Sequence, residues 1–484
     1  MRILCLNPGP SGSIDKKELF VKEGRCMERS GAWSNLRMPI SLAYISSILK
    51  KDGHEVRLID DIAEYSLNDK TKLDSILEKF QPDLAIINTS LPSVLTEDMF
   101  AVKKIKENYP NAIIAMIGVA PTLITNEILK AGPVDICIRK EPEMISKEIS
   151  ACIASGKDWK RVLGISFVHN KAIVTNPDAP LVDINALPMP DFDSLPLDAY
   201  RTPIDRKKQV LIDVSRGCPY KCIYCTGTKF YGHDFRYRNP EKVLEEIEHV
   251  KKLGVRKILF WADTFTFNKK FVIDLCNGMV ERGLEKDMSW VVNSRVNTID
   301  QEMLKHMDEA NCFLVAFGAE SGNQEILNYV NKGITLEQTR NAFKWVHETN
   351  IESAAHIVFG LAPFETETTI KKTLDFVKEI KPNYANFHIA TPYPGTELYA
   401  RYDKEGYIIN KEYARLESPK ANITLPNLSN NDLEHWRDKA FFDFYVTPRI
   451  AIQELKKVRS FPHLYNLVTN GLWFMQGWMN ARKL

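Results

Sequence analysis

Three cysteines stand within eight positions of this chain. Cys218, Cys222 and Cys225 form a C-x3-C-x2-C motif in "SRGCPYKCIYC", although the whole sequence of 484 residues has only nine cysteines. Thiolates at this spacing in a loop can converge on one metal centre. A four-iron cluster held by three cysteines would leave one iron open to a substrate or cofactor, which would explain why there are three thiols and not four.

Two other interpretations of the motif stay open. A zinc site needs a fourth ligand, usually supplied by a second Cys or His pair, and His233 has no partner at regular spacing. The cysteines could also be an incidental group in a loop. The remaining six are scattered without a pairing pattern, and we expect buried, reduced thiols of a cytosolic protein at these positions: Cys5, Cys26, Cys137, Cys152, Cys276 and Cys312.

Composition and charge exclude some classes of protein. Apolar residues make up 44% of the chain and charged residues 26%, as in a globular protein, and the net charge of +2 gives no electrostatic reason to expect a nucleic acid partner. The apolar run at the N-terminus is too short for a secretory signal. No stretch has about 18 uninterrupted apolar residues, so we expect no transmembrane segment and a cytoplasmic protein.

The elements that would position the cysteines fall into two series. Five short apolar runs in the first part alternate with helical patterns, which predicts a doubly wound parallel sheet of the Rossmann-like type. These runs are residues 2–7, 55–60, 83–88, 112–118 and 134–138. Ligands of such sheets bind beyond the carboxyl ends of the strands, where this chain carries turn sequences such as "NTSLPS" (88–93) and "GVAPT" (118–122).

The second series follows a segment rich in Pro and Asp at 176–205. Its six strand-like runs, separated by helical patterns, predict a partial TIM-like (β/α)6 barrel with its chemistry at the carboxyl ends of the strands: residues 209–215, 256–262, 288–294, 312–318, 354–360 and 384–390. The predicted domains are therefore 1–180 for the first sheet, 181–205 for a linker, 206–415 for the barrel and 416–484 for a small helical C-terminal region.

The cysteine motif, with Tyr224 just before its last cysteine and a strand just before the loop, resembles the radical S-adenosylmethionine superfamily. Five further stretches look like the successive strand-end motifs of that superfamily: "FWADTFTFNKK" (260–270), "WVVNSRVNTIDQEMLKHM" (290–307), "FGAESGNQEILNYVNKGIT" (317–335), "VFGLAPFETETTIKKT" (358–373) and "PYPGTELY" (392–399). The resemblance implies that the three cysteines hold a [4Fe–4S] cluster, whose open iron binds S-adenosylmethionine and whose electron releases a 5′-deoxyadenosyl radical.

The resemblance also implies roles for other residues near the cluster, and it places Tyr224 at the cofactor site. Arg295 would pair with the methionyl carboxylate, for which a planar guanidinium is suited. Glu320 would accept hydrogen bonds from the ribose hydroxyls or the methionyl ammonium, and Asp263 would lie near the amino group. Gly360 would allow close approach of the backbone to the adenine. Salt bridges or caps on the barrel rim, and a simple turn at the glycine, are the alternatives.

The order of a doubly wound domain before a radical barrel resembles the cobalamin-binding branch of the superfamily. A sheet without a cofactor is the alternative. The D-x-H-x-x-G motif that supplies a histidine ligand is absent, because "DGHEVR" has Arg57 in place of the glycine, and we interpret His54 as a turn residue. Contacts with the corrin and its tail are predicted for residues at the strand ends, namely Ser90, Gly118, Ala120, Pro121 and Thr122.

This resemblance implies a methyltransferase that acts at an unactivated carbon or at phosphorus, with a small-molecule substrate and an external electron donor such as flavodoxin or ferredoxin. The first alternative is an oxidative cyclase or rearrangement enzyme of the anaerobic magnesium-protoporphyrin ester cyclase type. The second is a non-catalytic cobalamin or metal sensor. The aromatic tail around Trp473, Phe474, Met475 and Trp478 predicts core packing, with a hydrophobic substrate entrance or a membrane-surface contact as alternatives.

Overall fold

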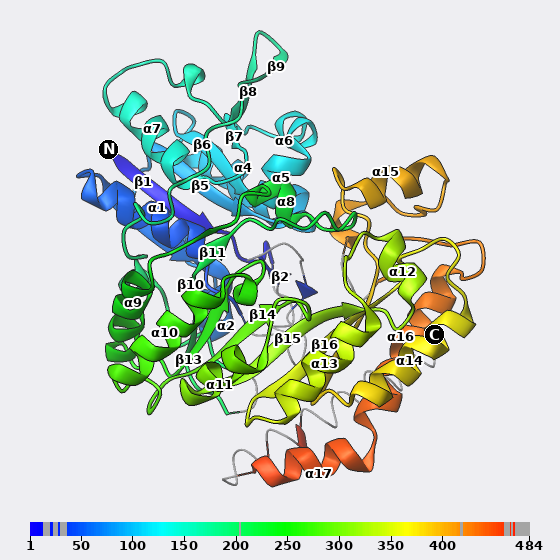
Figure 1. The fold of residues 1–484 in the computed structure, drawn as a ribbon. Coiled ribbons are helices and arrows are strands. Elements are labelled where there is room, and N and C mark those ends of the chain that lie inside the picture. Colours follow the sequence, from blue (N-terminus) through cyan, green and yellow to red (C-terminus); the bar gives the residue numbers. More distant parts are fainter. Residues whose placement is uncertain are drawn as a thin grey trace.

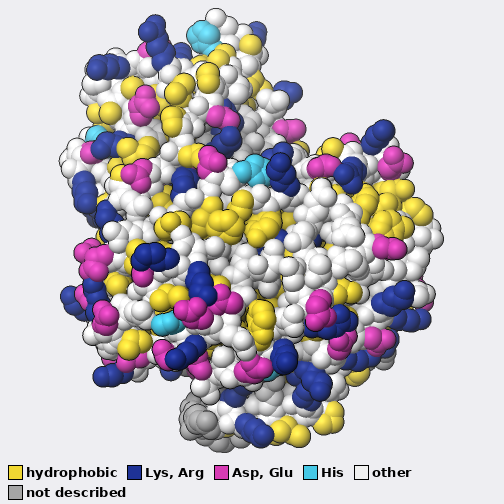
Figure 2. Space-filling view, viewed as in Figure 1, with side chains coloured by type: hydrophobic (Ala, Val, Ile, Leu, Met, Phe, Trp, Pro, Cys, Tyr) yellow, Lys and Arg dark blue, Asp and Glu magenta, His cyan; other side chains and the backbone are white. Residues whose placement is uncertain are grey.

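The structure, a computed structural model, is described for residues 1–12, 20–22, 28–29, 36–202, 205–416 and 420–458, and for residues 465, 468 and 469. It has two parallel sheets with helices packed against them, one formed by the first part of the chain and one by the second (Figure 1). Lys, Arg, Asp and Glu side chains are interspersed on the face shown in Figure 2. Among the helices of the described residues, none is long and apolar enough to cross a membrane.

The N-terminal sheet has the strand order β4-β1-β5-β6-β7-β8-β9. Strands β1, β5, β6 and β7 bury near-continuous apolar runs, as expected for strands covered on both faces, whereas the edge strand β4 alternates exposed and buried residues. The parallel strands match the five predicted runs: β1 Arg2–Asn7, β4 Glu55–Asp60, β5 Leu84–Thr89, β6 Ile113–Gly118 and β7 Ile136–Ile138. The helices are α1 Ile40–Lys51, α2 Asp61–Asn68, α3 Leu73–Leu77, α4 Met99–Asn108 after the π-helical turn Val94–Asp98, α5 Val119–Leu123, α6 Thr125–Ala131 and α7 Glu143–Ala154. A two-stranded ribbon pairs β2 Phe20–Val21 with β3 Glu28–Arg29.

Two antiparallel strands extend this sheet and were not predicted. Strands β8 Ile165–His169 and β9 Ala172–Thr175 form a hairpin that follows the 3₁₀ turn Trp159–Arg161. Their turn residues Asn170 and Lys171 both have positive φ, 49° and 67°. That is the geometry of a tight hairpin turn, which usually reveals itself in a sequence through a glycine. Here a lysine takes that position, so the sequence signal is weak.

The second sheet has its six strands in chain order, all parallel, as predicted for a partial barrel. They are β10 Gln209–Asp213, β13 Lys257–Trp261, β14 Ser289–Ser294, β15 Cys312–Glu320, β16 Glu352–Phe359 and β17 Tyr384–Ile389. The helices are α8 Gly227–Tyr231, α9 Pro240–Lys252, α10 Lys269–Glu281, α11 Gln301–Glu309, α12 Gln324–Tyr329, α13 Leu336–His347, α14 Glu367–Ile380 and α15 Glu397–Lys404. Short 3₁₀ turns lie at Phe265–Phe267 and Tyr413–Arg415. Asn or Asp side chains cap α9, α10, α11 and α12, and Thr side chains cap α13, α14 and α15, which explains where these helices begin.

In the part of the C-terminal region that the structure describes, the helices after the barrel are α16 Asn430–Tyr445 and α17 Pro448–Lys457. Helix α16 begins with a capping box at Ser429 and packs its aromatic side chains against the last strand, where the Phe441 and Phe387 rings lie 5.3 Å apart. The helical character predicted for this region holds up to residue 457. The aromatic tail with Trp473, Phe474, Met475 and Trp478 lies outside the described residues.

The predicted linker is packed against the first domain. Around its 3₁₀ turn Phe192–Ser194, Phe192 and Tyr200 are buried. The Tyr200 hydroxyl donates to Asp60 at 2.6 Å, and Asp191 accepts from Ser46 at 2.6 Å. Residues 181–202 therefore lie along the N-terminal domain as a strap, and the domain boundaries at 180, 205 and 415 stay predictions.

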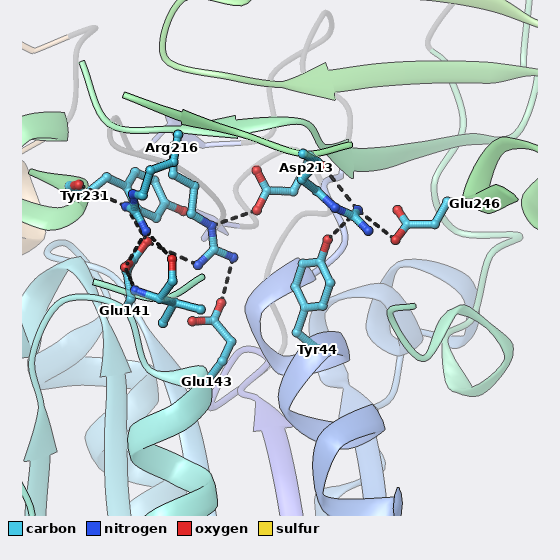
Figure 3. A network of polar contacts seen from close by, with 10 residues as sticks. Tyr44, Glu141, Glu143, Asp213, Arg216, Tyr231 and Glu246 are labelled. Carbon is cyan, nitrogen blue, oxygen red and sulfur yellow. Dashed lines mark hydrogen bonds and ion pairs between the residues drawn. The ribbon is translucent and has the colours of Figure 1, made fainter. Parts of the chain in front are cut away.

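The two halves meet in a network of buried ionic contacts, drawn in Figure 3. The hairpin of β11 Ser215–Arg216 and β12 Arg236–Tyr237 supplies Arg216, whose guanidinium contacts Asp213 at 2.8 Å, Glu143 at 2.7 Å and Glu141 at 3.3 Å. Glu141 and Glu143 belong to the N-terminal domain. Beside them, Arg238 contacts Glu246 at 2.7 Å and the hydroxyl of Tyr44 on α1 at 3.0 Å. Every carboxylate named here therefore faces an arginine, as buried charges require.

Candidate functional site

A cavity of about 1490 Å³ lies inside the barrel, and the three cysteines of the motif all line it. Four more of the predicted residues line the same cavity, namely Tyr224, Asp263, Arg295 and Glu320. These residues follow or end different strands of the second sheet. The parallel arrangement brings them to one end of the barrel, because the carboxyl ends of parallel strands share an edge.

The loop between β11 and α8 carries the cysteines and has a constrained backbone. Gly217 has a φ of +87°, and a Cβ there would lie 2.2 Å from the carbonyl oxygen of Asp234, so a side chain is excluded. The amide of Cys218 donates to Gly232 O at 3.3 Å and that of Cys225 to Cys222 O at 3.2 Å. The hairpin and these bonds together hold the loop over the mouth of the barrel.

Two of the cysteine sulfurs accept hydrogen bonds from their surroundings. Cys225 Sγ accepts from the amide of Gly227 at 3.3 Å, and Cys222 Sγ accepts from Arg295 at 3.7 Å. In the described part of the chain, no group of three or more His, Cys, Asp or Glu side chains is close enough to hold a single metal ion. Three thiols that line one cavity would suit a cluster of several irons, because its ligands need not converge on a single ion. Donors to the sulfurs stabilise the thiolates of such a cluster.

Arg295 is held in place by several neighbours. Its guanidinium lies 3.5 Å from the centre of the Tyr220 ring, donates to Asn297 Oδ1 at 3.1 Å and donates to the carbonyl oxygen of Lys332. The residue is 5% exposed. A guanidinium fixed beside a cysteine sulfur can bind a carboxylate in a defined orientation.

Glu320 forms a buried ion pair with Lys332, which sequence reasoning did not single out. The Lys332 ammonium lies 2.5 Å from Glu320 and 3.3 Å from the hydroxyl of Tyr224. Burial raises the pKa of Glu320, but the charge and hydrogen bond of Lys332 outweigh burial and the net pKa is lowered, so the carboxylate is ionised. Lys332 stands in "NYVNKGIT", a stretch that belongs to the quoted motif, but its role becomes visible only through the fold.

Gly360 does not line the cavity. It follows β16 with a φ of +83°, and a Cβ there would approach Ile423 at 3.0 Å, on the side of the C-terminal helices. Its amide and that of Leu361 donate to Glu365 at 2.8 and 3.1 Å, and Leu361 does line the cavity. Burial raises the pKa of Glu365 to about 7, against the lowering effect of these backbone hydrogen bonds. Glu365 thus shapes the loop at the end of β16.

The five residues predicted to contact the corrin lie at the carboxyl ends of β5 and β6 and on α5, and they do not line the barrel cavity. Gly118 has a φ of +108°, and a Cβ would lie 2.4 Å from Thr89 O. Ala120 and Pro121 are buried in α5, and Thr122 Oγ1 accepts from the amide of Lys140 at 2.8 Å. Helix α5 packs against α8, which directly follows Cys225, so the two predicted cofactor sites adjoin.

Ser90 belongs to a buried polar group at the same edge. Its hydroxyl contacts Ser93 at 2.7 Å, Ser93 donates to Asp98 at 2.7 Å, and Asp98 forms an ion pair with Lys22. Sequence reasoning missed Lys22 and Asp98, since neither stands in a recognisable motif. His54 lies in the turn between α1 and β4, as expected.

The scattered cysteines are mostly buried, as predicted. Cys5, Cys137, Cys276 and Cys312 are buried and unpaired, Cys152 is half-buried, and Cys26 lies outside the described residues. Burial raises the pKa of the four buried thiols, which keeps them protonated and unreactive.

Comparisons with known proteins agree with this arrangement. Residues 212–377 match the model of the radical SAM superfamily. An uncharacterized methyltransferase of Pyrococcus horikoshii is 31% identical over 428 residues, which cover 87% of this chain and 91% of that protein. The anaerobic magnesium-protoporphyrin IX monomethyl ester cyclase of Cereibacter sphaeroides is 27% identical, over 86% of this chain and 69% of the cyclase.

A solved structure shares the whole fold. The radical S-adenosylmethionine methyltransferase TsrM of Kitasatospora setae, solved with cobalamin and a [4Fe–4S] cluster bound, superposes with a TM-score of 0.72 over 100% of this chain and 99% of TsrM. The two sequences are only 15% identical, so this likeness concerns the fold.

Proposed function

The chain belongs to the cobalamin-binding radical S-adenosylmethionine enzymes, and we propose that it is a methyltransferase that acts on an unactivated carbon or a phosphorus of a small molecule. The observation that carries this proposal is the single cavity shared by Cys218, Cys222, Cys225, Arg295 and the Glu320–Lys332 pair. The methyltransferase relative, which aligns over most of both chains, supports the same reaction.

The residues around the cavity fit the cofactors of the family. Cys218, Cys222 and Cys225 would hold the [4Fe–4S] cluster, with the Gly227 amide and Arg295 as donors to its sulfurs. When bound, the cluster and S-adenosylmethionine supply the 5′-deoxyadenosyl radical, and cobalamin carries the methyl group. Arg295 would bind the methionyl carboxylate, and Tyr224 and Asp263 would lie beside the cofactor. Glu320, kept ionised by Lys332, would accept hydrogen bonds from the ribose or the ammonium group.

Cobalamin would lie against the carboxyl edge of the N-terminal sheet, at Ser90, Gly118, Ala120, Pro121 and Thr122. Only glycine fits at position 118, since the Cβ of any other residue would clash with the carbonyl oxygen of Thr89. His54 would not ligate the cobalt, because it lies in the turn before β4, at the opposite edge of the sheet from these residues. The adjoining α5 and α8 would bring the two cofactors to the same substrate space.

The deciding experiment measures the stoichiometry of the two products of S-adenosylmethionine. The anaerobic enzyme, a chemical reductant and S-adenosylmethionine with a deuterated methyl group would be incubated with a cell extract. A methyltransferase should give S-adenosylhomocysteine and 5′-deoxyadenosine in equal amounts and place the label in the product. Formation of 5′-deoxyadenosine with no labelled methyl in any product would contradict the proposal.

The cyclase relative favours a second candidate, an oxidative cyclisation with the same cofactors. In that reaction no methyl group leaves, so S-adenosylhomocysteine would not accompany 5′-deoxyadenosine. For either reaction we propose a cytoplasmic enzyme that receives its electron from flavodoxin or ferredoxin. Replacing the chemical reductant by each reduced carrier in the same assay would test this donor.

A further inference from the structure

The interior of the barrel is hollow well below the cluster loop. In a closed (β/α)8 barrel, bulky branched side chains fill this space. Here the inward positions of β15 and β16 carry Ala316, Gly318 and Ala354, and all three line the cavity. Its volume of about 1490 Å³ exceeds the roughly 300–1,000 Å³ that is usual for a ligand pocket. The small side chains therefore leave room for more than S-adenosylmethionine and the cluster.

The cavity extends along the whole length of the strands. Its lining includes Cys218 at the carboxyl end and also Lys257 and Glu352, which are the first residues of β13 and β16. From Glu352 to Val358, both of which line the cavity, a strand covers on the order of 20 Å. A ligand that fills this space would be long and narrow.

Charged side chains line only the two ends of this space. Among the described lining residues, the upper end has Arg37, Asp263, Arg295, Glu320 and Lys332, and the lower end has Asp205, Lys257, Glu352, Glu454 and Lys457. The lower groups pair with one another, Lys257 with Asp205 at 3.0 Å and Lys457 with Glu352 and Glu454 at 2.5 and 2.8 Å. They offer no excess positive charge for an anionic group.

Between the ends the wall is mainly apolar, with Leu211, Leu259, Val291 and Leu314 among its residues. The polar side chains on this part of the wall include two histidines on neighbouring strands, His356 and His388. Their ring nitrogens lie 3.5 Å apart and their rings are stacked, 5.7 Å between centres. Imidazoles can donate or accept a hydrogen bond, which suits a single hydroxyl or carbonyl oxygen.

The lower mouth has an apolar rim. Val446 and Leu455 line the cavity there and are 48% and 59% exposed. Leu455 belongs to α17, whose Lys457 pairs with Glu352 below the barrel. An apolar chain that reaches this mouth would contact Val446 and Leu455, and the charged side chains beside it are already paired with one another.

We propose that the substrate is a lipid-like molecule, an elongated uncharged chain with one hydroxyl or carbonyl oxygen, bound lengthwise in the barrel with that oxygen at His356 and His388. This inference rests on the proposed function, because it places the substrate in the cavity whose lining includes the residues proposed to hold the cluster and S-adenosylmethionine. It specifies the substrate class that the small inward side chains, the uncharged wall and the histidine pair would select.

The test measures binding of radiolabelled alkan-1-ols, from hexan-1-ol to octadecan-1-ol, to the anaerobic holoenzyme with S-adenosylmethionine by equilibrium dialysis. Affinity should rise about fourfold for each added methylene until the chain fills the cavity, as burial of one CH₂ implies. Affinity independent of chain length would overturn the inference.

Substitutions in the wall of the cavity and at the histidine pair locate the bound chain. Ala354→Leu, or Ala316→Leu on the neighbouring strand, should weaken binding of the longest alcohols at least tenfold, whereas Ala400→Leu on the exposed surface of α15 should not change it. His388→Phe should abolish the preference for an alkan-1-ol over its methyl ether. Unchanged binding of the longest alcohols in both Ala354→Leu and Ala316→Leu would overturn the inference. So would a wild type that binds an alkan-1-ol no better than its methyl ether.

The same preparations separate this inference from the proposed function. Iron content and 5′-deoxyadenosine release report on the cluster and on S-adenosylmethionine, and they are measured on the wild type and on the surface control Ala400→Leu, in which both should be normal. If the wild type lacks both, the proposed function fails whatever the alcohols do. If both are normal and the alcohols do not bind, the substrate class alone is wrong.

Discussion

The interface between the two halves and the interior of the barrel are built from different side chains. The interface is filled with arginines and carboxylates in contact, with Arg216 at 1% exposure between Asp213, Glu141 and Glu143. The barrel has apolar walls with alanines and a glycine at inward positions, and it encloses a cavity. In this fold, paired charges fix one half of the molecule against the other, and small inward side chains in the barrel leave space for a reaction.

The two regions meet in sequence at the cluster loop. Arg216 is only two residues before Cys218, so the contacts that join the halves also fix the start of the loop. We therefore expect substitutions in the interface to affect stability first, and substitutions around the cavity to affect chemistry first.

Cys222→Ala should abolish activity. The variant loses one of three cluster ligands, and the anaerobically reconstituted protein should fall well below the roughly four irons per cluster of the wild type. Release of 5′-deoxyadenosine should be lost as well. Cys152→Ala, which removes a half-buried cysteine on α7, serves as the matched control and should retain both. Full iron content in Cys222→Ala would contradict the cluster assignment.

Arg216→Met should destabilise the protein by about 3–5 kcal/mol, the usual cost of leaving buried charges without their partner. Asp213, Glu141 and Glu143 would all lose a contact. Denaturant unfolding followed by circular dichroism measures the change. The control is Lys270→Met, which removes an exposed pair with Asp274 and should leave the transition unchanged. Equal transitions in the two variants would show that the interface charges do not fix the halves.

Glu365, on the barrel side, is a buried carboxyl that accepts hydrogen bonds from backbone amides, whereas the buried carboxyls of the interface contact arginines. Its folded pKa of about 7 exceeds the ordinary value of 4.5. Between these two values the folded state binds the proton more than the unfolded state does, so stability should fall as pH rises through that window. The contribution is on the order of 1–3 kcal/mol.

Glu365→Gln removes this titration, and the variant should lose that part of the decline in unfolding free energy between pH 4.5 and 7. Urea titrations at several pH values provide the measurement. Identical slopes for the wild type and the variant would mean that the folded carboxyl titrates normally.

His54→Ala should have the smallest effect, which is none on cobalamin binding. The side chain lies in a turn that precedes β4, away from the strand ends where the corrin is proposed to bind. Equilibrium binding of hydroxocobalamin, together with the paramagnetic resonance of the reduced cofactor, checks this. Loss of binding, or a nitrogen hyperfine signal that disappears in the variant, would identify a histidine ligand.

Much of the fold could be predicted from the sequence because its signals are local. Short apolar or alternating runs predicted the parallel strands of both sheets, as far as the structure describes the chain, at nearly the observed bounds, and turn residues marked the helices between them. The β8–β9 hairpin was missed because Lys171 takes the left-handed position that usually has a glycine. The run at 209–215 is in fact a strand ending at Asp213 and the separate β11, since the chain bends there into the cluster loop.

The site was less predictable, because its contacts join distant parts of the chain. Cys218, Cys222 and Cys225 stand in one motif and could be read directly. Lys332 pairs with Glu320 across a loop and a helix, and His356 approaches His388 from a neighbouring strand, so neither pair has a local signature. Glu141 and Glu143 were visible only as charges after a strand, and their partner Arg216 lies more than seventy positions away.

The strap of residues 181–202 affects the rate at which a bound cofactor could exchange. Tyr200 and Asp191 attach it to the N-terminal domain, and Phe192 is buried beside them. The halves are thus joined both by the strap and by the charged interface. A hinge motion at the strap or at the interface would expose ions without their partners. We expect a corrin held between the halves to leave only when this joint unfolds locally, so its residence time should be long and loading should accompany folding.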